Sequence, residues 1–432
     1  MLSIYKLFCL INYPLWWLIL RIRSQRGKEH KRRYIEKLGY GYQKRPSGEV
    51  IWVHALGLGE TLGLTLFLEN LSQNFKNKTI LFTSSTLNSY LAFKNTNINK
   101  NVIHQFAPVD NYKSLGTFLA YWKPCMVLIS EIDLWPLRIL EVKKIDIPLI
   151  LFNSRMNEKK KNNRKIIYKT FKKMLNCFDY IYLQDEDSKK YFQYFGVSEK
   201  VIRICGPFKA AGAYSYKNKE YEKRLTQVFK NKFVWIAASL HKEEEIEILE
   251  SYKLAKKHLP HLFLVFVPRE PEIISDTIRK CRKYSENVAI RNKENQFPTT
   301  STEILIIATI GELGLWYKSS HIAFIGNSLD FKNVKTGKNP FEAIQENCVV
   351  IHGPKMLEPG YDNLKKIGIT DVVSNRHEIA SALVKYSLPK SRSVKIVKGK
   401  RHISRNQKLI YGFIENLKII YNEKREQKNL LP

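Results

Sequence analysis

Short apolar runs alternate with longer amphipathic runs along most of this chain. Short apolar runs bounded by turn-forming residues are typical of buried strands, whereas apolar residues at helical spacing indicate helices. In the first half, strands are expected at 50–54, 79–83, 102–105, 126–130, 149–153, 180–183 and 202–205. Helical runs lie between most of them, and one is expected from Thr61 to Leu71. This alternation predicts a parallel, doubly wound sheet.

The alternation restarts in the second half, after a polar connector at 213–230 that leads into a helix. Strands are expected there at 233–237, 262–267, 303–307, 322–325, 349–352 and 371–373. A basic amphipathic tail from about Lys400 to Lys428 predicts a closing helix. Two doubly wound halves of this kind bind ligands at the carboxyl ends of their strands, so a ligand cleft between the halves is expected.

The amino terminus is apolar from Met1 to Leu20, with Lys6 as its one charge, and seven Lys and Arg residues follow between Arg21 and Arg33. The run is marginal for spanning a bilayer and also suits a helix that lies in the interface. It has no small-residue cleavage site of a secretory signal peptide. The basic cluster favours an anchor at the cytoplasmic face, and the alternative is an ordinary first helix docked on the domain.

The net charge of the 432-residue chain is +32, which favours anionic partners such as nucleic acid, a membrane surface or phosphorylated substrates. The six cysteines form no Cys-x-x-Cys pair and the ten histidines no metal-spaced pair, so neither a zinc site nor a disulfide framework is indicated. The chain also lacks a Gly-x-Gly-x-x-Gly motif at its start and a Gly-Lys-Ser/Thr P-loop. These features argue against a plain dinucleotide oxidoreductase and a P-loop kinase.

Candidate chemistry in the first half lies just after predicted strands. Glu60 follows a glycine-bearing turn and belongs to the first turn of a helix, where the helix dipole favours an ionised carboxylate; helix capping is the alternative. Glu131 and Asp133 follow the strand at 126–130 and are candidates for proton transfer or positioning. Asn153 to Arg155 could bind an anionic group, and Lys209 could neutralise developing negative charge.

In the second half, three such positions suit a nucleotide. Arg269 follows Pro268 at a strand end and is suited to a phosphate, and Gly311 would permit close approach of the backbone. Asn339 as N-cap and Pro340 at the first helical position would form a helix start, where Glu342 could bind the vicinal hydroxyls of a ribose. Ser239 is expected to cap another helix. Together these elements predict a nucleotide-sugar donor site.

Taken in order, these segments resemble the 3-deoxy-D-manno-octulosonic acid (Kdo) transferases, enzymes of lipopolysaccharide assembly. In the first half, four family patterns have counterparts: His-Ala-x-Ser-Val-Gly-Glu at 54–60, Glu-Thr-Glu-Leu-Trp-Pro at 131–136, Asn-Ala-Arg-Leu at 153–156 and Gly-Asn-x-Lys at 206–209. In the second half, the counterparts are Ala-x-Ser-Thr-His at 237–241, Pro-Arg-His-Pro-Glu at 268–272, Met-Gly-Glu-Leu at 310–313 and His-Asn-Pro-Leu-Glu at 338–342. The preserved order is more specific than any one motif.

This resemblance implies an α/β GT-B fold of two Rossmann-like domains facing a cleft. It also implies an inverting, metal-independent transfer from CMP-Kdo to the lipid A precursor lipid IVA, with no cofactor. Glu60 would be the general base, and Glu131 and Lys209 would stabilise the transition state. The CMP site would comprise Pro268, Arg269, Ile310, Gly311, Glu312, Asn339, Pro340, Phe341 and Glu342. The chain departs from the family pattern at several positions, namely Gly57, Ala211, Leu240, Glu243, Ala308 and Lys338.

The expected organisation is an inner-membrane anchor at 1–22 with the body at the cytoplasmic face, an acceptor-binding domain at 23–212, a linker at 213–230, a CMP-sugar-binding domain at 231–400 and the closing helix at 401–432. The expected partners are CMP-Kdo, an anionic lipid A precursor and the inner-membrane surface, without nucleic acid. Two alternatives remain. One is a GT-B glycosyltransferase with another nucleotide sugar or a modified lipid acceptor. The other is a non-catalytic basic protein that binds membranes or nucleic acid, although no RNA- or DNA-binding motif is present.

Overall fold

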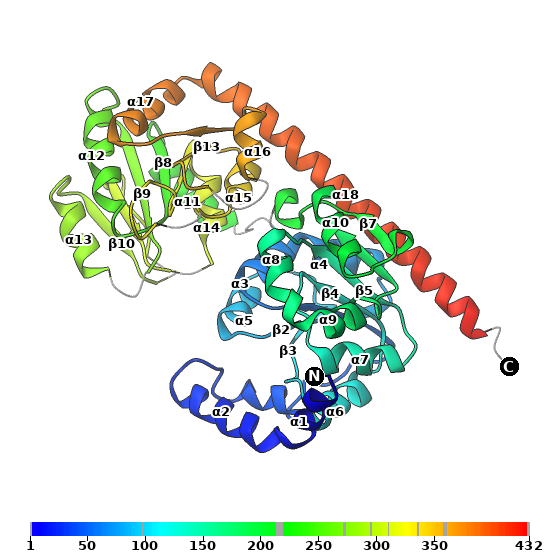
Figure 1. Ribbon diagram of the computed structural model, residues 1–432. Coiled ribbons are helices and arrows are strands. Elements are labelled where there is room, and N and C mark those ends of the chain that lie inside the picture. The colour runs from blue at the N-terminus through cyan, green and yellow to red at the C-terminus, as the bar shows by residue number, and fades with distance from the viewer. Residues whose placement is uncertain are drawn as a thin grey trace. The chain divides into compact units, whose positions relative to one another are not determined.

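A computed structural model of the chain describes residues 2–96, 98–212, 219–270, 274–293, 296–309, 311–334, 337–356 and 361–429 (Figure 1). The chain divides into two compact units. Unit 1 comprises Met1–Tyr214 together with Asn406–Pro432, and unit 2 comprises Ser215–Arg405. Each unit is built around one seven-stranded sheet in which all pairs are parallel.

The sheet of unit 1 has the strand order β3-β2-β1-β4-β5-β6-β7. Its strands are β1 (Glu49–Ala55), β2 (Lys78–Ser84), β3 (Val102–Phe106), β4 (Pro124–Ser130), β5 (Leu149–Ser154), β6 (Tyr180–Leu183) and β7 (Ile202–Ile204). The strand order reverses between the neighbours β1 and β4. Loops leaving the carboxyl ends of these two strands part to opposite sides there, which makes this switch point the usual ligand position of such a sheet.

The helices of unit 1 cover both faces of this sheet. They are α1 (Leu2–Ile11), α2 (Tyr13–Gln25), α3 (Leu58–Gly63), α4 (Thr65–Asn74), α5 (Leu87–Lys94), α6 (Tyr112–Trp122), α7 (Pro136–Lys144), α8 (Glu158–Arg164), α9 (Tyr168–Leu175) and α10 (Lys189–Tyr194). Among its 3₁₀ turns are η1 (Arg33–Leu38), η3 (Glu186–Ser188) and η5 (Phe208–Ala211).

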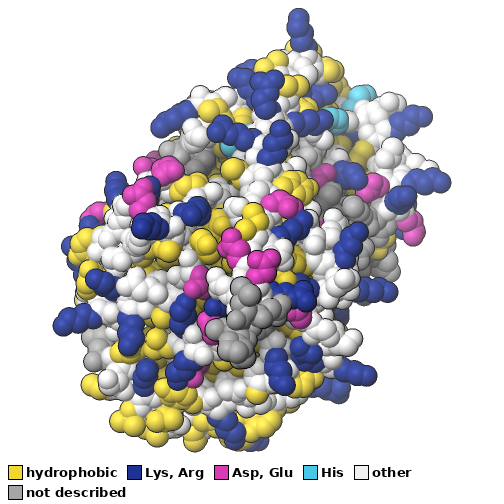
Figure 2. Space-filling view, turned by 90° about the vertical axis from the view of Figure 1, so that its right-hand side faces the viewer, with side chains coloured by type: hydrophobic (Ala, Val, Ile, Leu, Met, Phe, Trp, Pro, Cys, Tyr) yellow, Lys and Arg dark blue, Asp and Glu magenta, His cyan; other side chains and the backbone are white. Residues whose placement is uncertain are grey.

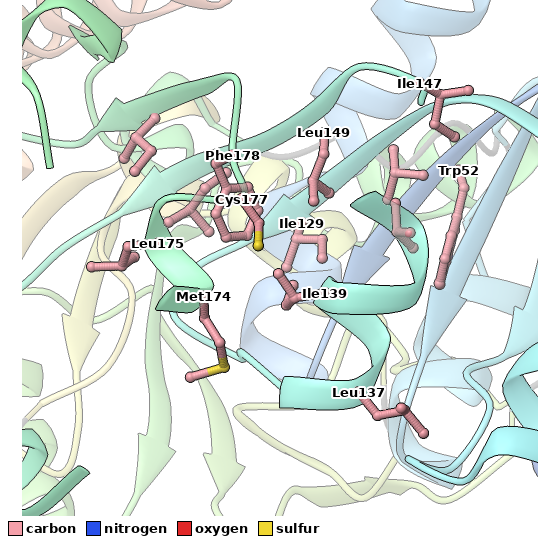
Figure 3. Packing of buried hydrophobic residues seen from close by; sticks show 14 of the residues in the cluster. Trp52, Ile129, Leu137, Ile139, Ile147, Leu149, Met174, Leu175, Cys177 and Phe178 are labelled. Atoms are coloured by element: carbon pink, nitrogen blue, oxygen red, sulfur yellow. The ribbon is translucent and has the colours of Figure 1, made fainter. Parts of the chain in front are cut away.

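Alternate residues of each strand enter two separate cores because successive strand side chains point to opposite faces. Trp52 and Ile129 pack with α6, α7 and α9 on one face (Figure 3). Ile51 and Leu128 pack on the other face with α4 and with the C-terminal part of a long helix, α18 (Pro389–Asn429). Both faces of the sheet are therefore apolar, and polar side chains gather at the strand ends.

The sheet of unit 2 has the order β10-β11-β9-β8-β12-β13-β14. Its strands are β8 (Phe233–Leu240), β9 (Leu262–Pro268), β10 (Val288–Arg291), β11 (Ile304–Ile307), β12 (Ile322–Ile325), β13 (Val349–His352) and β14 (Thr370–Val372). Its helices are α11 (Lys219–Val228), α12 (Glu245–Lys256), α13 (Ser275–Arg282), α14 (Leu313–Lys318), α15 (Phe341–Gln345), α16 (Tyr361–Lys366) and α17 (Arg376–Ser387).

The doubly wound prediction is confirmed, with four local corrections. Strand β10 was not predicted. The single helix expected at 61–71 is two helices, α3 and α4, which meet at Leu64. The closing helix begins at Pro389 instead of about Lys400. Ser239 lies within β8 at a positive φ of 61°, where the pairing with β9 shifts register, so it does not cap a helix.

The amino-terminal helices α1 and α2 dock on unit 1 by polar contacts. The Tyr5 hydroxyl donates to Asp110 (2.6 Å), and the Asn111 amide donates to the Cys9 carbonyl (2.7 Å) and to the Asn12 side chain (2.8 Å). Within the described residues, no single helix has the length and apolarity to cross a bilayer. Only α1 and α2 taken together pass that test, and they are bent by 66° relative to each other.

Helices α1 and α2 carry many exposed apolar side chains. They include Ile4 (73% exposed), Leu7 (61%) and Ile11 (70%). Figure 2 shows hydrophobic side chains gathered at the lower end of the molecule, where Figure 1 places these two helices. An exposed apolar surface of this kind is rare on a soluble monomer and marks an interaction surface.

Candidate functional site

Glu60 lies at the switch point of the unit 1 sheet. The turn after β1 places it in the first turn of α3, whose N-cap is Gly57. The Leu56 backbone N–H donates to Glu60 Oε2 at 2.7 Å, so the carboxylate closes the turn that presents it. Burial raises the pKa of Glu60 and the charge of Asp133 raises it further, whereas the Leu56 N–H and the charge of Lys209 lower it. Glu60 is thus a half-buried carboxylate with raised proton affinity.

Glu131 follows β4, the strand next to β1, at a positive φ of 59°. Its Oε1 accepts a hydrogen bond from Gln184 Nε2 (2.9 Å) and a longer one from Asn153 Nδ2 (3.4 Å). Burial raises the pKa of Glu131 to about 7, and the neighbouring charge of Glu60 contributes to this shift. The two carboxyl groups therefore form an interacting pair across the switch point.

Asn153 joins Glu131 to the segment that carries Lys209. Its side-chain oxygen accepts the Phe208 backbone N–H (3.0 Å), and its backbone oxygen accepts Gln184 Nε2 (2.7 Å). Asn153 has a positive φ of 51°, which an asparagine tolerates better than most residues. The ends of β4, β5 and β6 and the turn η5 thus meet in one network. Arg155, a candidate anion ligand, instead pairs with Asp185 (2.8 Å).

Lys209 runs along a glycine face of α3. A Cβ atom on Gly63 would lie 2.8 Å from Lys209 Cγ, and one on Gly59 would lie 3.9 Å from Lys209 Nζ. Gly59 and Gly63 are four residues apart and so share one side of the helix. Because Gly59 and Gly63 have no side chains, Lys209 can lie along the helix and reach the turn that carries Glu60. From there its charge lowers the pKa of both Glu60 and Glu131.

The fold thus brings Glu60, Glu131 and Lys209, three residues singled out from the sequence, to one edge of the sheet. Gln184 was missed, because a lone glutamine after a strand belongs to no motif. The packing role of Gly63 was also missed, since it depends on a turn that arrives from β7.

In unit 2, Pro268 ends β9 and Arg269 follows it at the carboxyl edge. The Arg269 backbone N–H donates to the Leu240 carbonyl (2.9 Å), and its guanidinium donates to the Asn327 side chain (3.1 Å). One open pocket is lined by Arg269, His241 and Lys242, and also by Glu245 and Glu270. Glu245 is paired with Lys280 at 2.7 Å. Arginine and lysine side chains at a strand end suit a phosphate group.

A buried carboxylate, Glu244, binds the backbone of two loops that contact Arg269. It is 0% exposed and accepts four backbone N–H groups, from His241 (2.9 Å), Asn327 (2.6 Å), Ser328 (2.8 Å) and Leu329 (3.0 Å). Glu244 therefore ties the loop after β12 to the loop after β8, and both loops bear on Arg269. This residue, too, carried no recognisable sequence signal.

Glu312 is engaged in a buried ion pair within the protein. Both of its carboxylate oxygens are bound by Arg291 of β10, at 2.8 and 2.6 Å, and the Thr309 hydroxyl also donates to it. Arg291 is 0% and Glu312 7% exposed at the side chain. The pair holds the loop after β11, where Gly311 has a positive φ of 91°. Ile310 lies outside the described residues.

The segment 339–342 forms a helix start, displaced by one residue from the prediction. Helix α15 begins at Phe341, and Pro340 is the residue before it. Asn339 Oδ1 accepts the Phe341 backbone N–H (3.1 Å), and Asn339 Nδ2 donates to Glu342 Oε1 (3.2 Å). Asn339 is therefore not the N-cap, which is Pro340, but its side chain still binds the first N–H of the helix. Phe341 is buried. Within the described ranges, no three or more His, Cys, Asp or Glu side chains are grouped so as to hold a metal ion.

Comparison with known proteins decides the family. A family model described as 3-deoxy-D-manno-octulosonic-acid transferase (kdotransferase) matches residues 32–211. A probable mitochondrial 3-deoxy-D-manno-octulosonic acid transferase of Arabidopsis thaliana is 32% identical over 81% of this chain and 79% of its own length. The chain belongs to the Kdo transferase family. The 3-deoxy-D-manno-octulosonic acid transferase of Rickettsia bellii is 30% identical over 82% of this chain and 83% of its own length.

A solved structure shares the fold of this chain. A glycosyltransferase structure from Rickettsia africae has a TM-score of 0.54, with 11% identity, and covers 88% of this chain and 99% of that one. At this identity the likeness concerns the fold alone. Membership of the Kdo transferase family makes the chain a glycosyltransferase. Its two Rossmann-like units have the GT-B type of architecture.

Proposed function

We propose that this Kdo transferase moves Kdo from CMP-Kdo to a lipid A precursor, lipid IVA, in lipopolysaccharide biosynthesis, with inversion at the anomeric carbon and Glu60 as general base. The observation that carries this assignment is the half-buried Glu60 carboxylate at the switch point, with Glu131 and Lys209 beside it. A general base works best when its pKa approaches the operating pH, and burial raises the pKa of Glu60 in that direction.

This placement supports a direct displacement at the anomeric carbon. A hydroxyl of the acceptor sugar gives its proton to Glu60 while its oxygen attacks the anomeric carbon of Kdo, and the bond to the CMP phosphate breaks. Lys209 supplies a positive charge beside the two carboxyl groups. Arg269, His241 and Lys242 would hold the departing phosphate in the unit 2 pocket. Asn339 to Glu342 would bind the nucleoside part, while the Arg291–Glu312 pair holds the neighbouring loop.

The membrane part of the proposal is that the exposed faces of α1 and α2 lie in the cytoplasmic interface of the inner membrane. Nine large apolar side chains of this pair are exposed, and Arg21, Arg26 and Lys28 stand exposed at its end. Apolar insertion combined with attraction to anionic headgroups is the usual basis of interfacial binding. Arg23 and Arg33 belong to internal ion pairs with Glu29 and Glu36, so only part of the basic cluster is available to lipid.

The anchor is tested by sedimentation with vesicles of phosphatidylglycerol and phosphatidylethanolamine. The wild-type protein should bind, and the double variant Leu7→Glu with Ile11→Glu should lose most of the binding. Ile166→Glu is the matched control, because Ile166 is 82% exposed elsewhere on unit 1. Equal binding of the double variant and the wild type would remove α1 and α2 as the anchor.

The reaction is tested by CMP release. Purified protein given CMP-Kdo and lipid IVA should release CMP, and Glu60→Gln should reduce this rate by at least about 100-fold, since loss of a general base costs roughly 100- to 10,000-fold. An enzyme that leaves CMP-Kdo untouched but turns over a UDP-sugar would contradict the donor assignment. Wild-type CMP release by Glu60→Gln would contradict the base assignment.

A further inference from the structure

His54 belongs to a buried chain of hydrogen bonds that leads from the core to the candidate site. The side chain of His54 is 0% exposed at the end of β1. Its Nδ1 lies 2.9 Å from the Thr83 hydroxyl of β2, and its Nε2 lies 3.0 Å from Asp133 Oδ2. The Thr83 hydroxyl in turn accepts the indole N–H of Trp52 at 2.8 Å.

The direction of these bonds follows from Asp133, because its ionised carboxylate can only accept. His54 Nε2 therefore carries a proton and donates to it. Burial lowers the pKa of His54, which keeps the ring neutral, so Nδ1 carries no proton and accepts from the Thr83 hydroxyl. Thr83 Oγ1 in turn accepts the Trp52 indole N–H, and it also lies 3.5 Å from the Val53 carbonyl.

Asp133 is held on several sides. Besides His54, the Trp135 indole N–H donates to its Oδ1 (3.0 Å), and Arg138 Nη1 lies 3.9 Å from its Oδ2. Although burial acts against it, the pKa of Asp133 is lowered by the hydrogen bond from His54, with Arg138 and Trp135 contributing. The carboxylate is therefore ionised and fixed in place at neutral pH, with 11% of its side chain exposed.

We propose that His54 is a positioning residue of the transferase: the Thr83 hydroxyl, itself bound by Trp52, holds the imidazole ring, and His54 in turn fixes the Asp133 carboxylate, whose charge acts on Glu60. This inference rests on the proposed role of Glu60 as base. Three charged or titratable groups act on Glu60 or with it, namely Asp133, Lys209 and Glu131. The charge of Asp133 raises the pKa of Glu60 and that of Lys209 lowers it, so a shift of the Asp133 carboxylate would change the pKa of Glu60.

The first test is the pH dependence of kcat/KM for CMP release. Glu60 must be deprotonated to act, so activity falls as the pH drops through its pKa. Asp133→Asn removes the charge that raises this pKa and keeps the shape of the side chain. The acidic limb should therefore move to lower pH by at least about 0.5 unit, within the range that one nearby charge produces. A limb that stays at the wild-type pH would overturn the proposal.

The second test is a matched pair at Thr83, which compares the enzyme with and without the hydroxyl that binds His54 Nδ1. Thr83→Val removes the hydroxyl at nearly constant volume, whereas Thr83→Ser retains it. The valine variant should lose about tenfold in kcat with the KM for CMP-Kdo within about threefold, as expected when only the positioning of a base is disturbed. The serine variant should restore kcat. Equal kcat in the two variants would overturn the proposal.

These outcomes are separable from failure of the proposed function. If Glu60→Gln retained wild-type activity, the base assignment would fail, and with it the premise of the inference. If Glu60→Gln were inactive while Asp133→Asn and Thr83→Val behaved as wild type, the base would stand and His54 would have no positioning role.

Discussion

Gly63 leaves the space that the Lys209 side chain occupies: a Cβ atom on residue 63 would lie 2.8 Å from Lys209 Cγ. The atom that would be displaced lies near the base of the lysine side chain, so the whole side chain would have to move. The contact explains why a glycine ends α3 and how Lys209, which follows the edge strand β7, comes to act on Glu60.

Gly63→Ala is therefore expected to lower kcat by roughly 10- to 100-fold, because a displacement of about 1 Å in a catalytic group can cost that much. The melting temperature should change little, because the helix preference of alanine over glycine, about 1 kcal/mol, offsets the cost of displacing the Lys209 side chain. Gly59→Ala is the matched control in the same helix, because its Cβ would make only an ordinary contact of 3.9 Å. The account is wrong at this point if both variants have equal kcat.

Glu131 is expected to lower the stability of the fold at neutral and alkaline pH. Its pKa is raised from 4.5 to about 7 by burial and by Glu60, so the folded state favours the protonated form. Below about pH 4.5, Glu131 is protonated in both the folded and the unfolded chain, so it does not change the free energy of unfolding. As the pH rises from 4.5 to 7, the unfolded chain ionises first, and the fold loses about 1–3 kcal/mol.

Glu131→Gln should accordingly unfold at a higher temperature than the wild type at pH 8, and the difference should shrink toward pH 5. Differential scanning calorimetry measures this comparison across the pH range. Glu186→Gln serves as the control, since Glu186 is exposed in the turn η3 and its replacement should leave the melting temperature unchanged. A pH-independent difference for Glu131→Gln would contradict the raised pKa.

The Arg291–Glu312 pair predicts a stability effect in unit 2. Glu312→Ala would leave the buried Arg291 charge without its carboxylate, which costs about 3–5 kcal/mol. Replacing both residues, as Arg291→Met with Glu312→Leu, should recover most of that loss because no unpaired charge remains. Urea unfolding of the three proteins tests this expectation. Wild-type stability in Glu312→Ala would show that the pair is not structural.

The sequence predicted the strands of both sheets well because buried parallel strands read as continuous apolar runs. Strand β10 was missed for a physical reason: it is an edge strand, and its residues Val288 to Ile290 are only partly buried. That omission also hid the partner of Glu312, since Arg291 ends β10. The sequence therefore suggested that Glu312 contacts a ligand, whereas in the fold both of its carboxylate oxygens bind Arg291.

The candidate site was predictable only where motifs follow strands. Glu60 and Glu131 could be placed at one edge because β1 and β4 end in recognisable segments. The contacts of Asn153 and Gln184 with Glu131, and of His54 with Thr83, depend on strand neighbours that no local pattern specifies. Such contacts require the strand order, which in this sheet places β1 between β2 and β4.

The central claim is that Glu60 activates an acceptor hydroxyl for Kdo transfer, and mass spectrometry of the lipid product tests it most directly. Lipid IVA incubated with CMP-Kdo and the wild-type protein should gain Kdo, and Glu60→Gln should form this product at least about 100-fold more slowly while still unfolding in one cooperative transition. A folded Glu60→Gln variant that forms the product at the wild-type rate would contradict the account.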